Sequence, residues 1–283
     1  MQTIAENIYY EDSYAGVNLG AVTLPSGTLL IDAPLRMEDA RTWKAALLTQ
    51  SQGTHRLLVV LDNHIDRTIS SGVIKYPIVA HEKTADVIKQ RGTTFKGRKV
   101  KIGADWEHYP DVKGTAWVLP SITFSEQLEF HWGETMIRIE HHPGPTPGAS
   151  WVHIPSKKIL FVGDAVTPNQ PPFLAKADLE VWHQTLNDLA SRRFYEYTIL
   201  TGRGGPINAE IARKQRKFLK SVRGRLNTML KNNVEPHETA EMIPALLEKI
   251  DYPAEMEEFY TQRLRYGLEQ YYRRKLLKED QAD

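Results

Sequence analysis

Short apolar runs alternate with helically spaced apolar positions in the first third of the chain, a pattern that predicts alternating strands and helices. Residues 57–61 (LLVVL) form an uninterrupted apolar run, which is typical of a strand buried on both faces. Layered α/β proteins carry their ligand loops at the carboxyl ends of such strands, so the polar segment 62–67 is a candidate site. Other strands are expected at 8–10, 17–23, 28–31 and 78–81, and helices at 38–49 and 82–90. The strand at 28–31 ends in the turn signal Asp32-Ala33-Pro34.

The second half of the chain first shows a series of strands and then helices. Strands are expected at 117–124, 128–131, 136–141, 150–154, 158–162 and 197–200, whereas the polar segment 91–114 receives no assignment. Apolar residues spaced along one helical face predict a helix over 177–190. Further helices are expected over 208–230, 239–250 and 253–277.

Composition narrows the class of protein. The chain has 283 residues, of which 41% are hydrophobic and 25% charged, enough to bury a sizeable core. The formal net charge of +1 gives no global attraction to nucleic acid or to an anionic membrane. The basic segment 213–225 also carries apolar residues at helical spacing, so we expect a solvated face over a packed stripe, with nucleic-acid binding as the alternative.

Cysteine is absent, which excludes disulfides and thiolate ligands for zinc. The first residues lack a basic segment followed by an apolar run, and no stretch is long enough to span a bilayer. We therefore expect a cytoplasmic chain without a membrane partner. The last helix presents apolar and aromatic residues that could line a substrate mouth, form a homo-oligomer contact or dock on the rest of the protein.

Four short segments carry the side chains suited to chemistry. They are 62–67 (DNHIDR), 142–148 (HPGPTPG), 161–165 (FVGDA) and 201–206 (TGRGGP). Their order and form resemble the metallo-β-lactamase superfamily, with its pattern His-x-His-x-Asp-His, Pro-Gly-His-Thr-Pro-Gly, Gly-Asp and Gly-His-Gly-Pro. This resemblance implies an α/β (α+β) fold, the four-layer αβ/βα sandwich, over residues 1–210. Residues 211–283 are then a C-terminal helical extension packed on it.

The resemblance also implies where metal ligands would lie. One metal of the superfamily would take positions 62, 64 and 145, a second would take 66, 67 and 203, and position 164 would bridge them. This chain retains His64, Asp66 and Asp164 at these positions. The other four positions hold Asp62, Arg67, Pro145 and Arg203. Proline and guanidinium cannot act as ligands, so a standard dinuclear zinc hydrolase is not expected.

The leading hypothesis is that Arg67 and Arg203 replace a metal ion by pairing with Asp66 and Asp164 in a salt-bridge network. Three clustered carboxylates, with Asp62 as the third, would be costly to bury without compensation. Two arginines and a protonated histidine nearly cancel that charge. The chain is then a non-hydrolytic or divergent member without a cofactor.

Two alternatives remain open. In the first, Asp62, His64 and Asp164 hold one divalent metal (Mn, Fe, Mg or Zn), with His141 or His142 as a candidate fourth ligand. Asp66 would then be the candidate base for hydrolysis of an ester, thioester or lactone. In the second, Arg67 and Arg203 bind a phosphate or carboxylate group of a small-molecule ligand.

Overall fold

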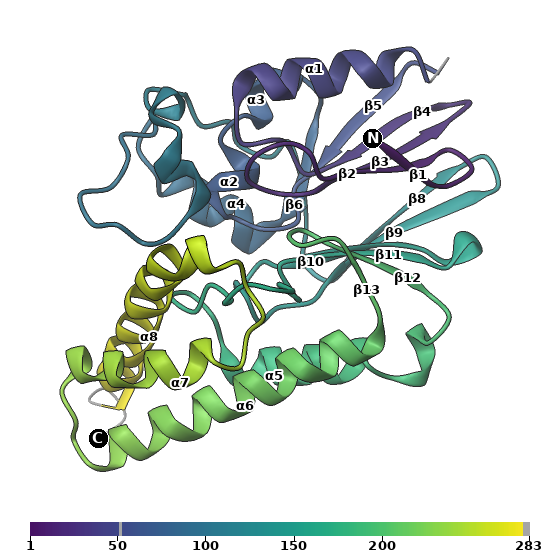
Figure 1. Cartoon of the computed structure of the whole chain (residues 1–283). Coiled ribbons are helices and arrows are strands. Elements are labelled where there is room, and N and C mark those ends of the chain that lie inside the picture. Colours follow the sequence, from purple (N-terminus) through teal and green to yellow (C-terminus); the bar gives the residue numbers. More distant parts are fainter. Residues whose placement is uncertain (51–52, 280–283) are drawn as a thin grey trace.

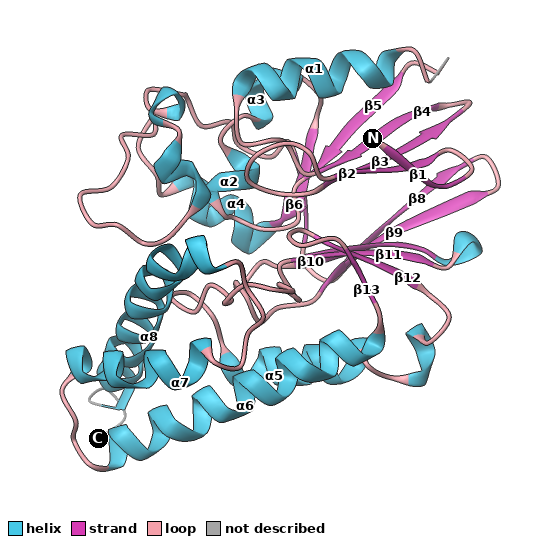
Figure 2. Ribbon diagram, in the orientation of Figure 1, coloured by secondary structure: helices cyan, strands magenta, loops and turns pink. Residues whose placement is uncertain are grey.

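The computed structural model describes residues 1–50 and 53–279, and within these residues two sheets pack face to face with helices outside (Figure 1, Figure 2). Apolar side chains from both sheets share one buried cluster between them, which includes Ile31, Val59, Val152 and Phe161. The helix α1 (Met37–Leu48) covers the outer face of the first sheet through Trp43. The outer face of the second sheet packs against helices from the second half of the chain. The four-layer architecture expected from the sequence is confirmed.

The first sheet contains seven strands in chain order within the described residues. They are β1 (Gln2–Ala5), β2 (Ile8–Glu11), β3 (Leu19–Leu24), β4 (Gly27–Ile31), β5 (His55–Val59), β6 (Ile78–His81) and β7 (Ile122–Phe124). The strands β4 and β5 are parallel, with Ile31 opposite Val59, so the segments that follow them emerge at the same edge. The strand β5 ends two residues earlier than the apolar run does, and Val60 and Leu61 continue into the site as buried loop residues.

The second sheet contains six strands in the order β13-β12-β11-β10-β9-β8, again within the described residues. They are β8 (Gln127–Trp132), β9 (Thr135–His141), β10 (Ser150–Ile154), β11 (Ile159–Gly163), β12 (Thr198–Thr201) and β13 (Pro206–Ile207). The strands β11 and β12 are parallel, with Gly163 opposite Thr201. Their carboxyl ends therefore carry residues 164 and 202–203 to one edge.

Two helices lie against the second sheet, α5 (Leu179–Leu189) and α6 (Ala209–Lys231) (Figure 1). In α6 the apolar stripe is buried, through Phe218, Leu219, Val222 and Leu226, whereas basic residues such as Lys217 and Lys220 are exposed. This confirms the expected amphipathic helix. Short helices also follow the strands of the first sheet: α2 (Ile65–Thr68), α3 (Ser71–Ile74) and α4 (Glu82–Lys89).

The C-terminal part differs in one respect from the expected pattern. The single helix expected over 239–250 is instead a 3-10 segment, Pro236–Met242, followed by the short helix α7 (Ile243–Leu247). Pro244 has no N–H to donate to residue 240, so an α-helix cannot run unbroken through this stretch.

The last helix, α8 (Glu257–Glu279), docks on the rest of the protein. Its residues Tyr260, Leu264, Leu268 and Tyr272 are buried in one hydrophobic cluster with residues of α5 and α6. Residues of α6 and α8 share this cluster with the second sheet, so the hydrophobic core continues past residue 210. The domain boundary expected at that residue stays a prediction.

The unassigned segment 91–114 contains two 3-10 turns, Asp105–His108 and Pro110–Val112. Trp106 is buried there and contacts Phe95 edge-on, with ring centroids 5.0 Å apart. This packing holds the segment over the end of the sandwich. Among residues 1–50 and 53–279, no helix combines the length and apolar character needed to cross a membrane.

Candidate functional site

The candidate site lies where β4, β5, β11 and β12 end, and it draws residues from both sheets. The parallel pairs deliver the loops after residues 31, 59, 163 and 201 to a common place. The structure brings together the side chains that the sequence motifs singled out. Asp62, Asp66, Arg67, Asp164 and Arg203 are each at least 97% buried, so the cluster is an interior feature.

Arg67 is the centre of the first half of the cluster. Its Nη1 donates to Asp32 Oδ2 over 2.6 Å, and its Nη2 donates to Asp164 Oδ1. Its Nε lies 3.0 Å from Asp62 Oδ1, in an ion pair without hydrogen-bond geometry. The side chain has no exposed surface. All three guanidinium nitrogens thus face carboxylates, and these carboxylates raise the pKa of Arg67 although burial opposes the charge.

Arg203 forms the second half. Its Nη2 donates to Asp66 Oδ2 over 2.7 Å and its Nε to Asp164 Oδ2 over 3.2 Å. Its Nη1 donates to the Gly16 carbonyl at 2.9 Å and to the carboxylate of Asp105. All three nitrogens of this guanidinium are therefore paired as well.

Asp164 lies between the two arginines and accepts from both. Burial alone would raise the pKa of its carboxyl, but Arg67, Arg203 and then His64 outweigh burial and hold that pKa well below its usual range. Asp164 is therefore an ionised carboxylate, and it links the two halves of the cluster.

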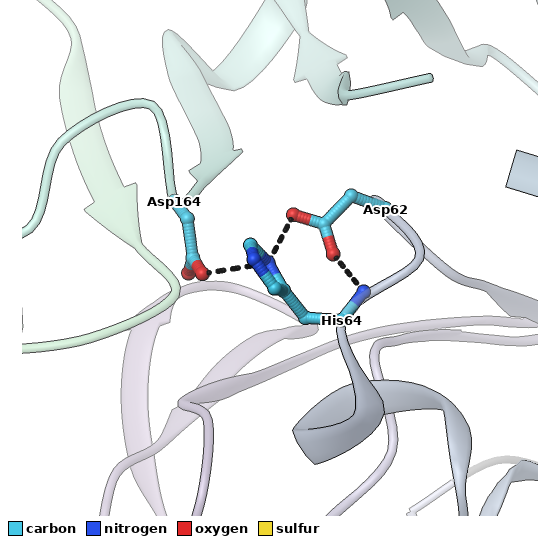
Figure 3. A group of neighbouring side chains, drawn as sticks. All are labelled: Asp62, His64 and Asp164. Carbon is cyan, nitrogen blue, oxygen red and sulfur yellow. Dashed lines mark hydrogen bonds and ion pairs between the residues drawn. The ribbon is translucent and has the colours of Figure 1, made fainter. Parts of the chain in front are cut away.

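The imidazole of His64 lies between two carboxylates, as Figure 3 shows. Its Nδ1 is 3.0 Å from Asp62 Oδ2 and 3.2 Å from Asp164 Oδ2. Burial would lower the pKa of this histidine, but the two carboxylates raise it to about 9. The ring consequently carries a positive charge at neutral pH, with Nδ1 as a proton donor.

A family model matches the stretch of chain that begins at His64 and ends just before Arg203. Residues 64–202 match the model of the Metallo-beta-lactamase superfamily. The chain is a metallo-β-lactamase-fold protein. No curated protein sequence matches the chain.

Solved structures of the metallo-β-lactamase fold match nearly the whole chain or about three quarters of it. A metallo-beta-lactamase family protein from Thermus thermophilus matches with a TM-score of 0.66 and 15% identity, over 98% of this chain and 95% of that one. A metallo-beta-lactamase from Pontibacter korlensis gives 0.60 and 19% identity, over 77% and 97%. The stereoselective inverting sec-alkylsulfatase Pisa1 from Pseudomonas sp. gives 0.68 and 13%, over 97% of this chain but only 50% of the sulfatase. At these identities the likeness concerns the fold.

Two further carboxylates of this metallo-β-lactamase-fold protein join the cluster although the sequence analysis did not select them. Asp32 is 1% exposed, and its Oδ1 accepts the backbone N–H of Leu61 over 2.9 Å. The sequence pattern marks it only as part of a turn, yet its place directly after a buried strand was a usable signal. Asp105 lies in the segment 91–114, where the sequence offered no signal.

The added carboxylates change the charge balance. Five aspartates face two arginines and one charged histidine. Burial raises the pKa of Asp32 to about 7, despite the opposing effect of Arg67. Burial also raises the pKa of Asp66, although Arg203 acts in the opposite direction. These two raised pKa values reduce the excess of negative charge that the fold encloses.

The positions of the superfamily's two-metal centre do not fit two zinc ions here. Guanidinium groups of Arg67 and Arg203 contact the very carboxylates that a second metal would need, and Pro145 offers no ligand atom. Within the described part of the chain, Asp62, His64 and Asp164 do offer ligand atoms within 4.8 Å of one another. A single ion would have to displace the proton on His64 and compete with both arginines for Asp164.

His141 and His142 are not in this group. The Nε2 of His141 is 2.8 Å from the carbonyl of Pro147, and its ring stacks on His81. His142 stacks on Trp151 with ring centroids 3.5 Å apart. Both histidines are thus engaged in packing near the end of β9.

Proposed function

We propose that this chain is a non-hydrolytic, metal-independent member of the metallo-β-lactamase fold. The observation that carries the proposal is the pairing of Asp164 with both Arg67 and Arg203. In the superfamily pattern, position 164 bridges the two metals. Two permanent cations on that carboxylate take over the charge role of the ions.

Electrostatics supports the same conclusion. The two guanidinium groups are 0% and 3% exposed, and each is paired on all three nitrogens. A divalent cation placed among them would meet like charge in a medium of low dielectric constant, where repulsion is strong. Asp66 accepts from Arg203 and from the backbone N–H of Trp106 at 3.1 Å, so it is poorly placed to serve as a base.

A second candidate function is favoured by one observation, the Asp62–His64–Asp164 group. A single divalent ion bound there would supply Lewis acidity for hydrolysis of an ester, thioester or lactone bond. The ligand set is rich in carboxylate and poor in imidazole, so manganese, iron or magnesium would suit it better than zinc.

The remaining alternative, a ligand pocket formed by Arg67 and Arg203, loses support from the same contacts. Their guanidinium donors already meet carboxylates or a backbone carbonyl. A small-molecule anion would therefore have to displace an existing partner of either residue.

Metal analysis separates the first two functions. Protein purified without added metal should contain far less than one equivalent of any divalent metal, and its melting temperature should not change with a chelator. The matched control is the variant His64→Gln, which removes the imidazole ligand and should give the same metal content. About one equivalent of bound metal, lost in His64→Gln and accompanied by a lower melting temperature in chelator, would establish the single-metal function instead.

A further inference from the structure

Arg263 on α8 is a buried arginine that forms no salt bridge with any residue the structure describes. Its side chain is 1% exposed. Its Nε donates to the carbonyl of Gly103 over 2.6 Å, and its Nη1 donates to Gln170 Oε1 over 2.7 Å. Its Nη2 is buried and has no hydrogen-bond partner among the described residues. Arg263 therefore differs from Arg67 and Arg203, which face carboxylates.

Such an arrangement is costly unless something completes it. The carboxylates of Asp105 and Asp66 attract this guanidinium from beyond salt-bridge distance, but burial outweighs them and lowers the pKa of Arg263. A buried charge without a directly paired carboxylate loses its hydration, and an unpaired buried donor loses a hydrogen bond. The guanidinium carbon of Arg263 lies 4.1 Å from the ring centre of Phe173 and 5.0 Å from that of Tyr260. These aromatic faces offset part of the cost, but they cannot accept the hydrogen bonds of a planar guanidinium edge.

Arg263 also lines a small cavity between α8 and the end of the sandwich. The cavity has a volume of about 90 Å³. Among the residues that the structure describes, its lining includes four basic residues and no acidic one: His64, Arg98, Lys176 and Arg263. Arg98 and Lys176 are exposed, so they lie at the mouth, and Arg98 Nη1 donates to the hydroxyl of Tyr266 at 2.9 Å.

The size of the cavity limits what can enter. Sites for whole metabolites usually enclose roughly 300 to 1,000 Å³, whereas one water molecule takes about 30 Å³. A cavity of about 90 Å³ suits one small group of a few heavy atoms. Arg263 lines the cavity with a guanidinium that is not fully hydrogen-bonded, and the other basic lining residues add positive charge. This lining favours a group that is negative and accepts hydrogen bonds.

We propose that this cavity binds an oxyanion, either a free small anion or the carboxylate or phosphate group of a small molecule, with Arg263 as its buried partner. Arg98 and Lys176 attract the anion at the mouth, and Phe173 forms an apolar wall beside it. The inference rests on the proposed function in one respect. Without a metal beside His64, the charge of the ligand has to be met by cations of the chain itself.

The test measures binding of two probes, inorganic phosphate and acetate, to the full-length protein in the presence of EDTA. Thermal melts and calorimetric titrations are compared with sodium chloride at the same ionic strength. At least one probe should raise the melting temperature above the chloride control. The double variant Arg98→Ala/Lys176→Ala should weaken the affinity roughly threefold to tenfold, since two exposed charges are lost. The control Lys99→Ala/Lys217→Ala removes two exposed lysines outside the cavity and should leave the affinity unchanged.

Arg263→Gln should weaken probe binding by more than about tenfold, as expected when a charged hydrogen-bond partner is removed. If that variant does not fold, the double variant Arg98→Ala/Lys176→Ala and its control decide the question.

The inference is overturned if neither probe raises the melting temperature of metal-free protein beyond the chloride control. It is also overturned if the double variant binds the probe as tightly as its control does. Bound metal, together with an anion effect that persists in EDTA and depends on Arg98 and Lys176, would overturn the proposed function alone. An anion effect abolished by EDTA would overturn both.

Discussion

Arg203 donates a hydrogen bond to Asp66 over 2.7 Å, although the two residues lie 137 positions apart in the chain. Arg203 follows a strand of the second sheet and Asp66 follows a strand of the first. In the pair between Arg67 and Asp164 the arginine follows a strand of the first sheet and the aspartate follows a strand of the second. The cluster therefore connects the two sheets at the edge where the superfamily's pattern would position the metal ions.

Removal of the Arg67 guanidinium should destabilise the fold strongly. Arg67→Ala leaves Asp32, Asp62 and Asp164 without their shared partner in a buried place. We expect the free energy of unfolding to fall by about 3 to 5 kcal/mol, the size typical of breaking a buried ion pair from one side. Urea denaturation followed by circular dichroism measures this loss.

The matched control for this prediction is Arg273→Ala. Arg273 is 53% exposed and pairs with Glu269 one turn away on α8, and exposed pairs contribute less than about 1 kcal/mol. Equal and small losses for both variants would contradict the interpretation of Arg67 as a replacement for a buried ion.

His64 should make the fold less stable as the pH rises above neutrality. Its pKa is raised from the ordinary 6.5 to about 9, with Asp62 and Asp164 overcoming the effect of burial. A pKa that is higher in the folded state means that the imidazolium contributes fully below pH 6.5 and that this contribution is lost as the pH passes through about 9. His64→Gln should flatten the decline in unfolding free energy between these values. His131→Gln, a change at a histidine that is 68% exposed, should leave the decline as it is.

Asp32 should add a second pH dependence in a lower range. Its pKa is raised from 3.8 to about 7 because burial outweighs the attraction of Arg67. Folding therefore favours the protonated form, and stability should fall as the pH rises from about 4 through 7. Asparagine tolerates the left-handed backbone at this position (φ 61°) and cannot ionise. Asp32→Asn should remove this part of the decline in urea unfolding, whereas Asp251→Asn at an exposed position should retain it.

Gly202 should not accept a side chain. A Cβ at this position would lie 2.8 Å from Asp164 Oδ1 and 3.1 Å from Arg67 Nη2. Gly202→Ala would force the ion pair apart, and we expect a loss of roughly 1 to 3 kcal/mol in unfolding free energy.

The control for that variant is Gly224→Ala, within α6. Apart from the adjacent backbone of α6 itself, no atom of the described residues lies within 4 Å of a Cβ there, so alanine should stabilise the helix by about 0.5 to 1 kcal/mol. In thermal melts we expect a lower melting temperature for Gly202→Ala and a higher one for Gly224→Ala. A neutral or stabilising effect of Gly202→Ala would mean that the cluster relaxes around an added methyl group.

Much of the scaffold and of the site could be predicted from the sequence. The apolar run 57–61 predicted a buried strand that carries the segment 62–67 at its end. The resemblance of the four motifs to the metallo-β-lactamase superfamily implied the sandwich, and it implied that Arg67, Asp164 and Arg203 lie together.

The other members of the cluster, and the residues that cover it, come from segments whose positions depend on packing between distant parts of the chain. Asp105 comes from a segment without a periodic pattern, and its place depends on the packing of Trp106 against Phe95. Arg263 comes from the last helix, and its contact with the loop at Gly103 arises only when α8 docks. The sequence specifies the side chains. Which distant side chains become buried together depends on how the helices and sheets pack against one another.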